Sequence, residues 1–555
     1  MLNNPLLTKN ILRKLGFIYD NLINWKKILK DKDRENYLNI KKNKEKKKIL
    51  IATSTGGHLA CAHFDSVLAF ALTLDNWDVE ILLCDKSLTA CQQSTTHLIK
   101  EENFIEEGPK KLCNACFDSG RMIFDGLDLK VLKFSEFFNK DIEEKIKIDL
   151  KNYSYNKFND LKLDDYVKEH ALAGALRFYA VGDLDNERSH EKVLYKYLYS
   201  GLKTKYLFEN IIDSQKYQTV VLNHGVYVPQ GIINNVSKKN KINAVCYSPG
   251  YKKNSFTLSH DDTYHITMMN EDTKLWENLE WSKKLDKKLM DYLYSRRFGK
   301  NDWEYYFSKP EFDYKNKFKK YGVDLNKPVV GMLTNIIWDA LLTYPSNIFK
   351  NMMEWVYLTI EYFSKREDIQ LVIRVHPAEV KSDRISKQKV SEEIFKKYKT
   401  LPKNIFIIDS DDNLSTYSLA DICDSILIYS TKMGMEFSPF GIPVICAGEA
   451  YVKNKKITLD PKSKEEYKEM LGLIPFKKKL SEENILRAKK YAYHFFFRRM
   501  ITLESIKHVP FKWPPFILDQ KGVKKILEKK DKGLNQICDS IKNNSPFIFK
   551  DENLI

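Results

Sequence analysis

The chain has 555 residues, of which 43% are hydrophobic, and it carries a formal net charge of +17. This length is too great for a single hydrophobic core, so we expect two large domains with appendages. No apolar run reaches the roughly 20 residues that span a bilayer, and nine cysteines without secretory features argue against a disulfide framework. We therefore expect a cytoplasmic protein with an anionic partner, although a Lys-, Asn- and Ile-rich composition explains the charge equally well.

Residues 1–48 are expected to form an appendage to the first domain. Apolar residues recur there every three or four positions among Lys and Arg, as in a basic amphipathic helix: Leu7, Ile11, Leu15, Ile18, Leu22, Trp25 and Leu29. A Lys-rich linker follows them. Two interpretations are open. The helix lies on the anionic inner face of the cytoplasmic membrane, where each basic residue contributes about 1 kcal/mol, or it packs on its own protein.

The first large domain is expected over residues 49–310 and opens with a β-α unit. A buried strand at 49–52 leads through a Gly-rich turn into a helix at 59–74, and a second strand ends at Cys84. Gly56 and Gly57 would let the backbone approach a ligand, with His58 at the start of the helix. The turn lacks the spacing of a dinucleotide or Walker motif, so no cofactor follows from it.

Four cysteines come next in the chain: Cys84, Cys91, Cys113 and Cys116, the last two as Cys-x-x-Cys. Four thiolates can hold a structural Zn²⁺ or iron–sulfur centre that braces a loop. A redox pair and ordinary buried thiols are the alternatives, and together they are favoured. Six residues separate the upstream pair, which is wider than the usual metal-ligand spacing.

Charged segments fill much of the remaining first domain. The charged pattern of residues 127–163 indicates surface helices, and that of residues 270–325 indicates helices that link the two lobes. Between them, an apolar helix within 170–185 carries Arg177. This arginine either binds an acidic acceptor or pairs with a nearby carboxylate, which is the commoner case.

The candidates for a catalytic base also lie in the first domain. A buried strand at 220–223 ends where His224 occupies a turn, and imidazole is the side chain best matched to proton transfer near neutral pH. A lone histidine is more often a hydrogen-bonded structural residue. His224 is nevertheless the first candidate, with His58 and Asp261 next, because all three are expected at the rim of the same sheet.

The second domain is expected over residues 311–480 and reads as alternating strands and helices. Such alternation with short turns predicts a parallel, doubly wound sheet. The expected strands are 329–333, 371–375, 405–408, 426–429 and 444–446, and the expected helices are 352–365 and 414–420. A long helix at 481–506 is expected to cross back onto the first domain, and the Lys-rich tail after Gly522 to be peripheral.

The segment after the strand at 426–429 predicts a site for a nucleotide sugar. Ser430 or Thr431 would cap a helix whose first N–H groups and positive dipole end bind phosphate, and Glu436 would take ribose hydroxyls. Ligands of such sheets bind outside the carboxyl ends of the strands. The polar residues expected there from neighbouring strands are Thr334, Asn335, Arg374 and His376.

Several motifs together resemble a known family. TNIIWDA, IRVHPAE, STYSLAD, YSTKMGMEFSPFGIPVICAG and ITLDPKSKEEY resemble bacterial capsule polysaccharide biosynthesis proteins, which are GT-B glycosyltransferases related to the Kdo transferases of capsule assembly. The resemblance is closest over residues 329–471 and weaker for NHGVYVPQG, the GDLD segment and the cysteines. It implies two Rossmann-like lobes, and a CMP-sugar around His376-Pro377. The chain shows no confident match to the family's N-lobe acidic motif.

We therefore expect a glycosyltransferase that moves a sugar from a nucleotide-sugar donor to a surface polysaccharide or a lipid-linked acceptor, with no cofactor for catalysis. The alternatives are a sugar-nucleotide epimerase, a polyol-phosphate transferase, and a membrane-associated assembly factor without catalytic activity. A nucleic-acid partner is not expected, because basic residues are spread widely and no recognition motif is present.

Overall fold

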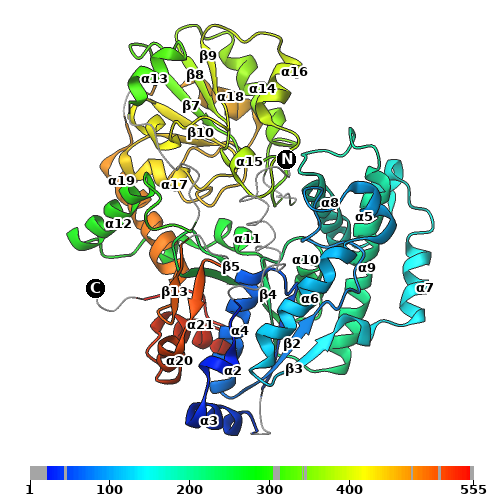
Figure 1. Ribbon diagram of the computed structural model, residues 1–555. Coiled ribbons are helices and arrows are strands. Elements are labelled where there is room, and N and C mark those ends of the chain that lie inside the picture. The colour runs from blue at the N-terminus through cyan, green and yellow to red at the C-terminus, as the bar shows by residue number, and fades with distance from the viewer. Residues whose placement is uncertain are drawn as a thin grey trace.

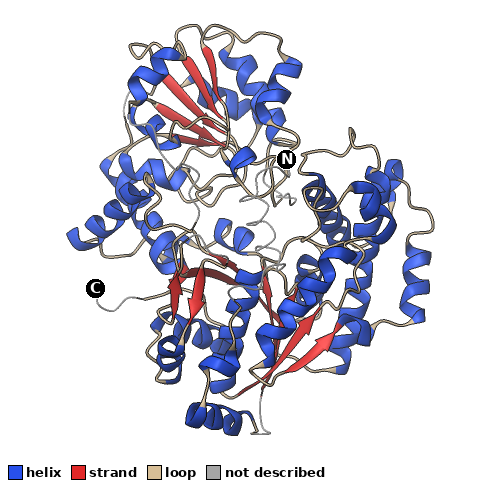
Figure 2. Ribbon diagram, viewed as in Figure 1, coloured by secondary structure: helices blue, strands red, loops and turns tan. Residues whose placement is uncertain are grey.

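The protein consists of two α/β lobes that face each other across a cleft (Figure 1). The computed structural model describes residues 22–42, 47–303, 313–340, 342, 347–476, 479–510 and 514–550. Each lobe has a sheet with helices packed on both faces (Figure 2). No helix in these ranges combines the length and the apolar composition needed to cross a bilayer.

The N-lobe is built on a seven-stranded sheet in the order β12-β6-β5-β4-β1-β2-β3. The strands β1 to β5 are parallel, whereas β6 is antiparallel to both β5 and β12. The strands are β1 (Lys47–Ser54), β2 (Trp77–Leu83), β3 (Lys130–Lys133), β4 (Thr219–Asn223), β5 (Asn243–Pro249), β6 (Ser255–His260) and β12 (Met500–Thr502). The covering helices are α4 (Leu59–Leu74), α5 (Glu101–Glu107), α6 (Lys110–Asp125), α7 (Lys140–Asp149), α8 (Asp165–Tyr179), α9 (His190–Ser214) and α10 (Gln230–Lys239).

The C-lobe has a five-stranded, fully parallel sheet in the order β11-β10-β7-β8-β9. Its strands are β7 (Val329–Leu333), β8 (Gln370–Arg374), β9 (Ile405–Ile408), β10 (Ser425–Ile428) and β11 (Val444–Cys446). Its helices include α13 (Tyr314–Lys320), α14 (Met352–Phe363), α15 (Ala378–Lys381), α16 (Val390–Lys397), α17 (Gly434–Phe437) and α18 (Lys464–Gly472).

The parallel strands β1 to β5 of the N-lobe share one order with the five strands of the C-lobe. In each set, the first strand lies in the middle, the second and third lie on one side, and the fourth and fifth on the other, and β6 and β12 extend the N-lobe sheet beyond β5. The order of the strands therefore reverses between the neighbouring strands β1 and β4 in one lobe, and between β7 and β10 in the other. The carboxyl ends at such a reversal are where open α/β sheets bind ligands. The prediction of two Rossmann-like, doubly wound lobes in a GT-B arrangement is confirmed.

Two parts of the first domain differ from the prediction. Residues 127–163, expected to be helical, contain the edge strand β3, because Val131 and Leu132 pair with β2 among charged neighbours. The boundary between the lobes also lies earlier than residue 310. The helix α12 (Lys283–Arg296) packs against α19 (Glu482–Tyr493), and Leu285 and Leu289 join a core with C-lobe strands.

The C-terminal region returns to the N-lobe, but as a shorter helix than expected. The helix α19 passes into a π-helical turn at His494–Arg499 and then into β12, which adds to the N-lobe sheet. The tail beyond residue 522 is not peripheral. The helices α20 (Gln520–Leu527) and α21 (Lys532–Asn543) pack on α4, and Ile526 and Ile537 are buried there. Apolar residues every third or fourth position explain this packing.

The described part of the N-terminal appendage packs on the N-lobe. Trp25, in α2 (Trp25–Ile28), lies 4.9 Å from the ring of Phe70, and Tyr37, in α3 (Asp31–Lys41), lies 5.2 Å from it. Leu29 is also buried. The part of the predicted amphipathic helix from Leu7 to Ile18 lies outside the described residues, so contact with an anionic membrane stays a prediction.

Candidate active site

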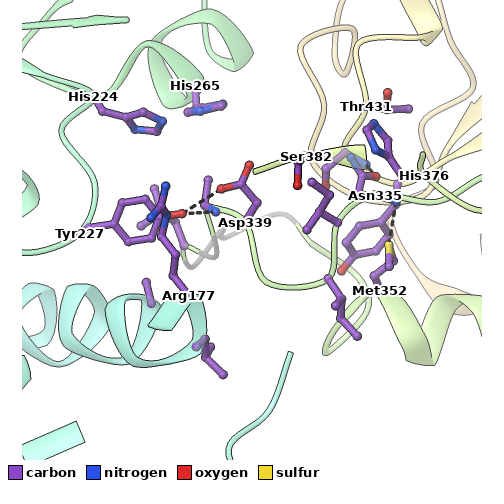
Figure 3. A pocket seen from close by; sticks show the side chains of 18 of the residues that line it. Arg177, His224, Tyr227, His265, Asn335, Asp339, Met352, His376, Ser382 and Thr431 are labelled. Atoms are coloured by element: carbon purple, nitrogen blue, oxygen red, sulfur yellow. Dashed lines mark hydrogen bonds between the residues drawn. The ribbon is translucent and has the colours of Figure 1, made fainter. Parts of the chain in front are cut away.

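A cleft of about 2910 Å³ lies between the lobes, at the carboxyl ends of both sheets. Each lobe contributes one wall of it (Figure 3). The N-lobe wall includes His58, Gln92, Arg177, His224, Tyr227 and His265, and the C-lobe wall includes Asn335, Asp339, His376, Ser430, Thr431 and Lys432. Polar groups of different chemistry therefore face one another across a single space.

His224 occupies the turn at the end of β4, as predicted. Its backbone has a φ of 64°, which L-residues rarely adopt, and its amide donates to the carbonyl of Tyr247 at 2.7 Å. This turn brings the ring to the cleft, 5.5 Å from the ring of His265 on α11 (Tyr264–Met269). Burial, and to a lesser extent Arg177, lower the pKa of His224 to about 4, although Asp339 acts in the opposite direction. The imidazole is therefore neutral at pH 7 and able to accept a proton.

His58 also lines the cleft, at the end of the Gly-rich turn that follows β1. The turn also packs closely on a neighbouring helix, and its approach to a ligand stays a prediction. A Cβ on Gly56 would lie 2.5 Å from the Cα of Gly120 on α6, so the missing side chain permits close packing of the turn on this helix. His58 thus reaches the cleft because α6 holds the turn in place.

Asp261, the third candidate for the base, lies outside the cleft. Its side chain is exposed, and its amide donates to the carbonyl of Ala244 near the start of β5. The amide of His224 instead bonds Tyr247, near the end of the same strand. Because β6 runs antiparallel to β5, its last residues lie at the opposite edge of the sheet from the cleft. The prediction of a shared rim was wrong for Asp261.

The four cysteines lie behind the N-lobe wall and carry free thiols. Cys116 accepts a hydrogen bond from the amide of Gly57 at 3.1 Å, and burial raises the pKa of Cys84 to about 12, assisted by the nearby thiol of Cys91. Burial followed by neighbouring thiols also raises the pKa of Cys113 and of Cys116. Across the described ranges, no three or more His, Cys, Asp or Glu side chains are grouped so as to hold a metal. A structural Zn²⁺ or iron–sulfur centre at these thiols stays a prediction that metal analysis tests.

His376 lies on the C-lobe wall, and two hydrogen bonds fix its position. Its amide donates to the Oγ1 of Thr334 at 3.2 Å, and its Nδ1 accepts from the amide of Ala378 at 3.2 Å. Burial, with Lys432 and Arg374, lowers the pKa of His376 to about 3, so the ring is neutral at pH 7. Since Nδ1 is an acceptor, the proton of the neutral ring lies on Nε2, which is then a hydrogen-bond donor. Thr334 is buried and positions His376 from behind.

Asn335, Ser430 and Thr431 lie together on the same wall. The Oδ1 of Asn335 accepts from the amide of Ser430 at 3.1 Å, and the Oγ1 of Thr431 accepts from the amide of Met433 at 3.3 Å. The helix expected to start here is a single turn, α17, which begins only at Gly434. Its dipole is correspondingly small, so a phosphate here must be bound mainly by side chains. The helix-dipole prediction was wrong in this respect.

Two predicted sugar-donor contacts are structural residues instead. Glu436 is buried and accepts from the Nε of Arg296 at 2.9 Å and the hydroxyl of Tyr417 at 2.5 Å, so its carboxylate is not presented to a ribose. Arg374 is buried as well and donates to the carbonyls of Ile408, Asp409, Asp412 and Leu414, which shapes the loop after β9. Neither side chain lines the cleft.

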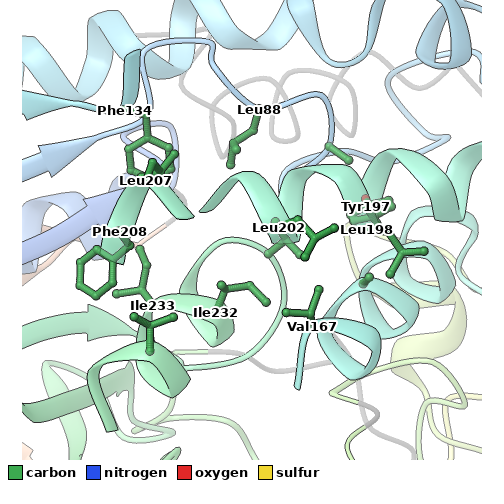
Figure 4. Close-up of a cluster of buried hydrophobic side chains, with 14 of the residues drawn as sticks. Leu88, Phe134, Val167, Tyr197, Leu198, Leu202, Leu207, Phe208, Ile232 and Ile233 are labelled. Carbon is green, nitrogen blue, oxygen red and sulfur yellow. The ribbon is translucent and has the colours of Figure 1, made fainter. Parts of the chain in front are cut away.

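Two basic residues also line the cleft: Lys432 was not predicted, whereas Arg177 was expected either to bind an acidic acceptor or to pair with a carboxylate. Lys432 adds a positive charge to the C-lobe wall, with its Nζ 4.3 Å from the ring centre of Tyr251. Arg177 lies on α8 with its guanidinium 4.9 Å from the ring centre of Tyr227, and its NH1 donates to the carbonyl of Gln92 at 2.9 Å. The packing of α8 on α9 through Val167, Leu198 and Leu202 keeps this helix in place (Figure 4).

Asp339 is the least expected member of the site. It follows β7 in the C-lobe but lies beside Tyr227, His224 and Arg177 of the N-lobe, away from His376 (Figure 3). Its position within the TNIIWDA motif was the only signal for it in the sequence.

No protein-family model matches the chain, and no curated protein matches it either. Among solved structures, it is similar to the beta Kdo 2,4 transferase KpsC of Thermosulfurimonas dismutans, with 14% identity, 49% of this chain and 79% of that chain covered, and a TM-score of 0.33. It is also similar to a putative UDP-N-acetylglucosamine 2-epimerase of Listeria monocytogenes, with 10% identity, coverage of 91% and 100%, and a TM-score of 0.29. The spinosyn rhamnosyltransferase SpnG complexed with spinosyn aglycone matches at 10% identity, coverage of 80% and 95%, and a TM-score of 0.25. With TM-scores this low, the activity has to be inferred from the site.

Proposed function

We propose that the protein is a glycosyltransferase that takes a sugar from a nucleotide-sugar donor bound on the C-lobe wall and transfers it to an acceptor hydroxyl bound on the N-lobe wall. The observation that carries this proposal is the division of the cleft. One wall presents neutral imidazoles that can accept a proton, and the other presents hydrogen-bond donors with a lysine. Sugar transfer needs both at once, a base for the acceptor and stabilisation for a phosphate that leaves.

On the C-lobe wall, the leaving phosphate is the group to be stabilised. The groups of this wall that would bind its oxygens are the Nε2–H of His376, the hydroxyls of Ser430 and Thr431, and the ammonium of Lys432. Such groups act most strongly where they are already in position and partly shielded from water. The hydrogen bonds that His376 donates to Thr334 and accepts from Ala378 provide that positioning.

On the N-lobe wall, His224 is the base. As the acceptor oxygen bonds to the anomeric carbon, its proton passes to His224, and the bond from that carbon to the phosphate oxygen breaks with its electron pair on the phosphate. A pKa of about 4 makes His224 a weak base before a substrate binds. The negative charges of a bound nucleotide sugar would raise this pKa, because a nearby anion favours the imidazolium.

Contacts between the lobes close one side of the cleft. The amide of Gly182 donates to the Oε1 of Gln388 at 2.7 Å, and Lys387 forms an ion pair with Glu187 at 2.6 Å. Closure of this kind excludes water, which would otherwise hydrolyse the sugar donor. We further propose a saccharide or lipid-linked acceptor of a capsule-type surface polysaccharide, made at the inner face of the cytoplasmic membrane. The motif resemblance supports this part.

The test is a panel of CMP-, UDP-, GDP- and CDP-linked sugars. Nucleotides that bind should raise the melting temperature, and those that are substrates should release free nucleotide in the presence of saccharide or lipid-linked acceptors. Release of a nucleotide sugar with inverted configuration, without an acceptor, would identify an epimerase. Transfer of a polyol phosphate would identify the related transferase, and binding without turnover of any member would identify an assembly factor. Each of these three results would overturn the proposal.

A further inference from the structure

We propose that Asp339 is a positioning residue for His224, so that the C-lobe supplies the carboxylate that the N-lobe base requires. This inference rests on the proposed role of His224 as the base. In this role, Asp339 orients the side chains around the imidazole and stabilises the positive charge that His224 acquires.

The position of Asp339 is set by contacts with the N-lobe. The hydroxyl of Tyr227 donates to the Oδ1 of Asp339 at 3.0 Å, and the amide of Ala340 donates to the same hydroxyl oxygen at 2.7 Å. Tyr227 is almost fully buried, with 3% of its surface exposed, so it is a firm anchor. Asp339 itself is exposed within the cleft, with its carboxylate on the side of His224 (Figure 3).

The groups around His224 come from several elements. Arg177 on α8 contributes a positive charge, Tyr264 and His265 on α11 contribute rings at 5.8 and 5.5 Å, and Tyr227 lies 6.1 Å away on the same loop. Burial and the positive charge of Arg177 both disfavour an imidazolium at His224. Asp339 is the carboxylate that opposes them, and it acts to raise the pKa of His224.

The segment after β7 that carries Asp339 also contacts the sugar-donor wall. At its start, Thr334 accepts from the amide of His376, and Asn335 accepts from the amide of Ser430. Further along it, Asp339 and Ala340 bond Tyr227. Residues 334–340 therefore connect the two walls. The base is complete only when the lobes are closed on this segment, which limits proton transfer to water while the cleft is open.

Asp339→Asn is the decisive variant, because the amide retains an oxygen for the Tyr227 hydroxyl but loses the charge. We expect kcat to fall about tenfold near neutral pH, with the KM for the sugar donor unchanged, because the imidazolium that forms during proton transfer loses the carboxylate that stabilises it. The acidic limb of the kcat profile should also move to lower pH, since removal of a carboxylate lowers the pKa of His224. Asp339→Glu, which keeps the charge, should recover most of the rate and the position of the limb.

Asp261→Asn is the matched control, because Asp261 is an exposed N-lobe carboxylate outside the cleft and its loss should leave both kcat and the limb as in the wild type. If Asp339→Asn lowers kcat without moving the limb, or leaves both unchanged while His224→Ala is inactive, the role of Asp339 is refuted and the proposed function stands. If Asp339→Asn does not fold, the position of the limb in Asp339→Glu and Asp339→Ser decides in the same way. Absence of turnover by the wild type with the whole panel would overturn the function and this inference together.

Discussion

The two lobes share a strand order but present different chemistry at the ends of their strands. After β1 and β4, the N-lobe places His58 and His224, and α11 adds His265. After β7 and β10, the C-lobe places an amide and hydroxyls, Asn335, Ser430 and Thr431. In the proposed mechanism, the same framework therefore serves proton transfer in one lobe and binding of an anion in the other. The comparison teaches that the few residues after each strand, rather than the sheet, determine what a lobe does.

The largest expected effect comes from removing the base on the N-lobe side. His224→Ala should lower kcat by about 10²- to 10⁴-fold, the range of a general base, while the KM for the sugar donor changes little. Steady-state kinetics with the best nucleotide sugar measure both. Asp261→Asn is the control, because Asp261 lies at the far edge of the sheet and should leave turnover unchanged. A large change in donor KM for His224→Ala would mean that proton transfer and donor binding are not separated between the two walls.

Next in size is a change in the C-lobe that should affect stability and not binding. Glu436→Ala removes one partner of the buried Arg296, which should reduce the free energy of unfolding by about 3 kcal/mol, because Asp302 still pairs with this arginine. Urea denaturation measures this loss. Burial alone would raise the pKa of Glu436, but Arg296, Lys432 and Tyr417 together hold it below the ordinary value. The stabilisation should therefore persist above about pH 4 and disappear as the pH falls further.

The folded fraction of Glu436→Ala should bind nucleotide sugars as the wild type does. Weaker binding with normal stability would restore the original prediction that this carboxylate contacts ribose.

His376→Ala should produce a smaller effect, confined to the sugar donor. Loss of one hydrogen bond to a charged phosphate costs about 1.5 to 3 kcal/mol, which is roughly a 10- to 150-fold loss of affinity. Isothermal titration calorimetry with the nucleotide sugar measures it. Thr334→Val removes only the acceptor for the amide of His376 and should weaken binding less. Equal affinities for His376→Ala and the wild type would remove His376 from the donor site.

The smallest expected effect is the absence of a pH dependence. A bound phosphate also raises the pKa of His376, but it does so from a value of about 3, so we expect the ring to stay neutral between pH 5 and 8 and the affinity for the nucleotide sugar to be constant in this range. Turnover, which depends on His224, should fall at acid pH. A rise in donor affinity as the pH falls through 6.5 would show that His376 is charged in the complex, and would blur the distinction between the walls.

Much of the framework could be predicted because its signals are local. Short apolar runs followed by polar turns identified β1, β4, β7 and β10, and thereby placed His224 and Ser430 at the correct strand ends. The edge strand β3 was missed because it is only half-buried and lies among charged residues.

The direction of a polar side chain depended on partners that are distant in the sequence. Glu436 turns toward the core because Arg296, 140 residues away, lies beneath it. Asp261 comes directly after the last residue of β6, and the antiparallel direction of this strand places it at the edge of the sheet opposite the cleft. Asp339 reaches the N-lobe through Tyr227, 112 residues away in the chain. Local pattern contains none of these pairings.

The strand β12 has a consequence for how the protein is made. It completes the N-lobe sheet, and α20 and α21 cover α4, yet all three are synthesised after the entire C-lobe. Until then, the nascent N-lobe presents the unpaired edge of β6 and an uncovered apolar helix face, both of which favour aggregation. We expect that a fragment ending before residue 500 would be insoluble when expressed alone, and that co-expression of residues 500–550 would rescue it.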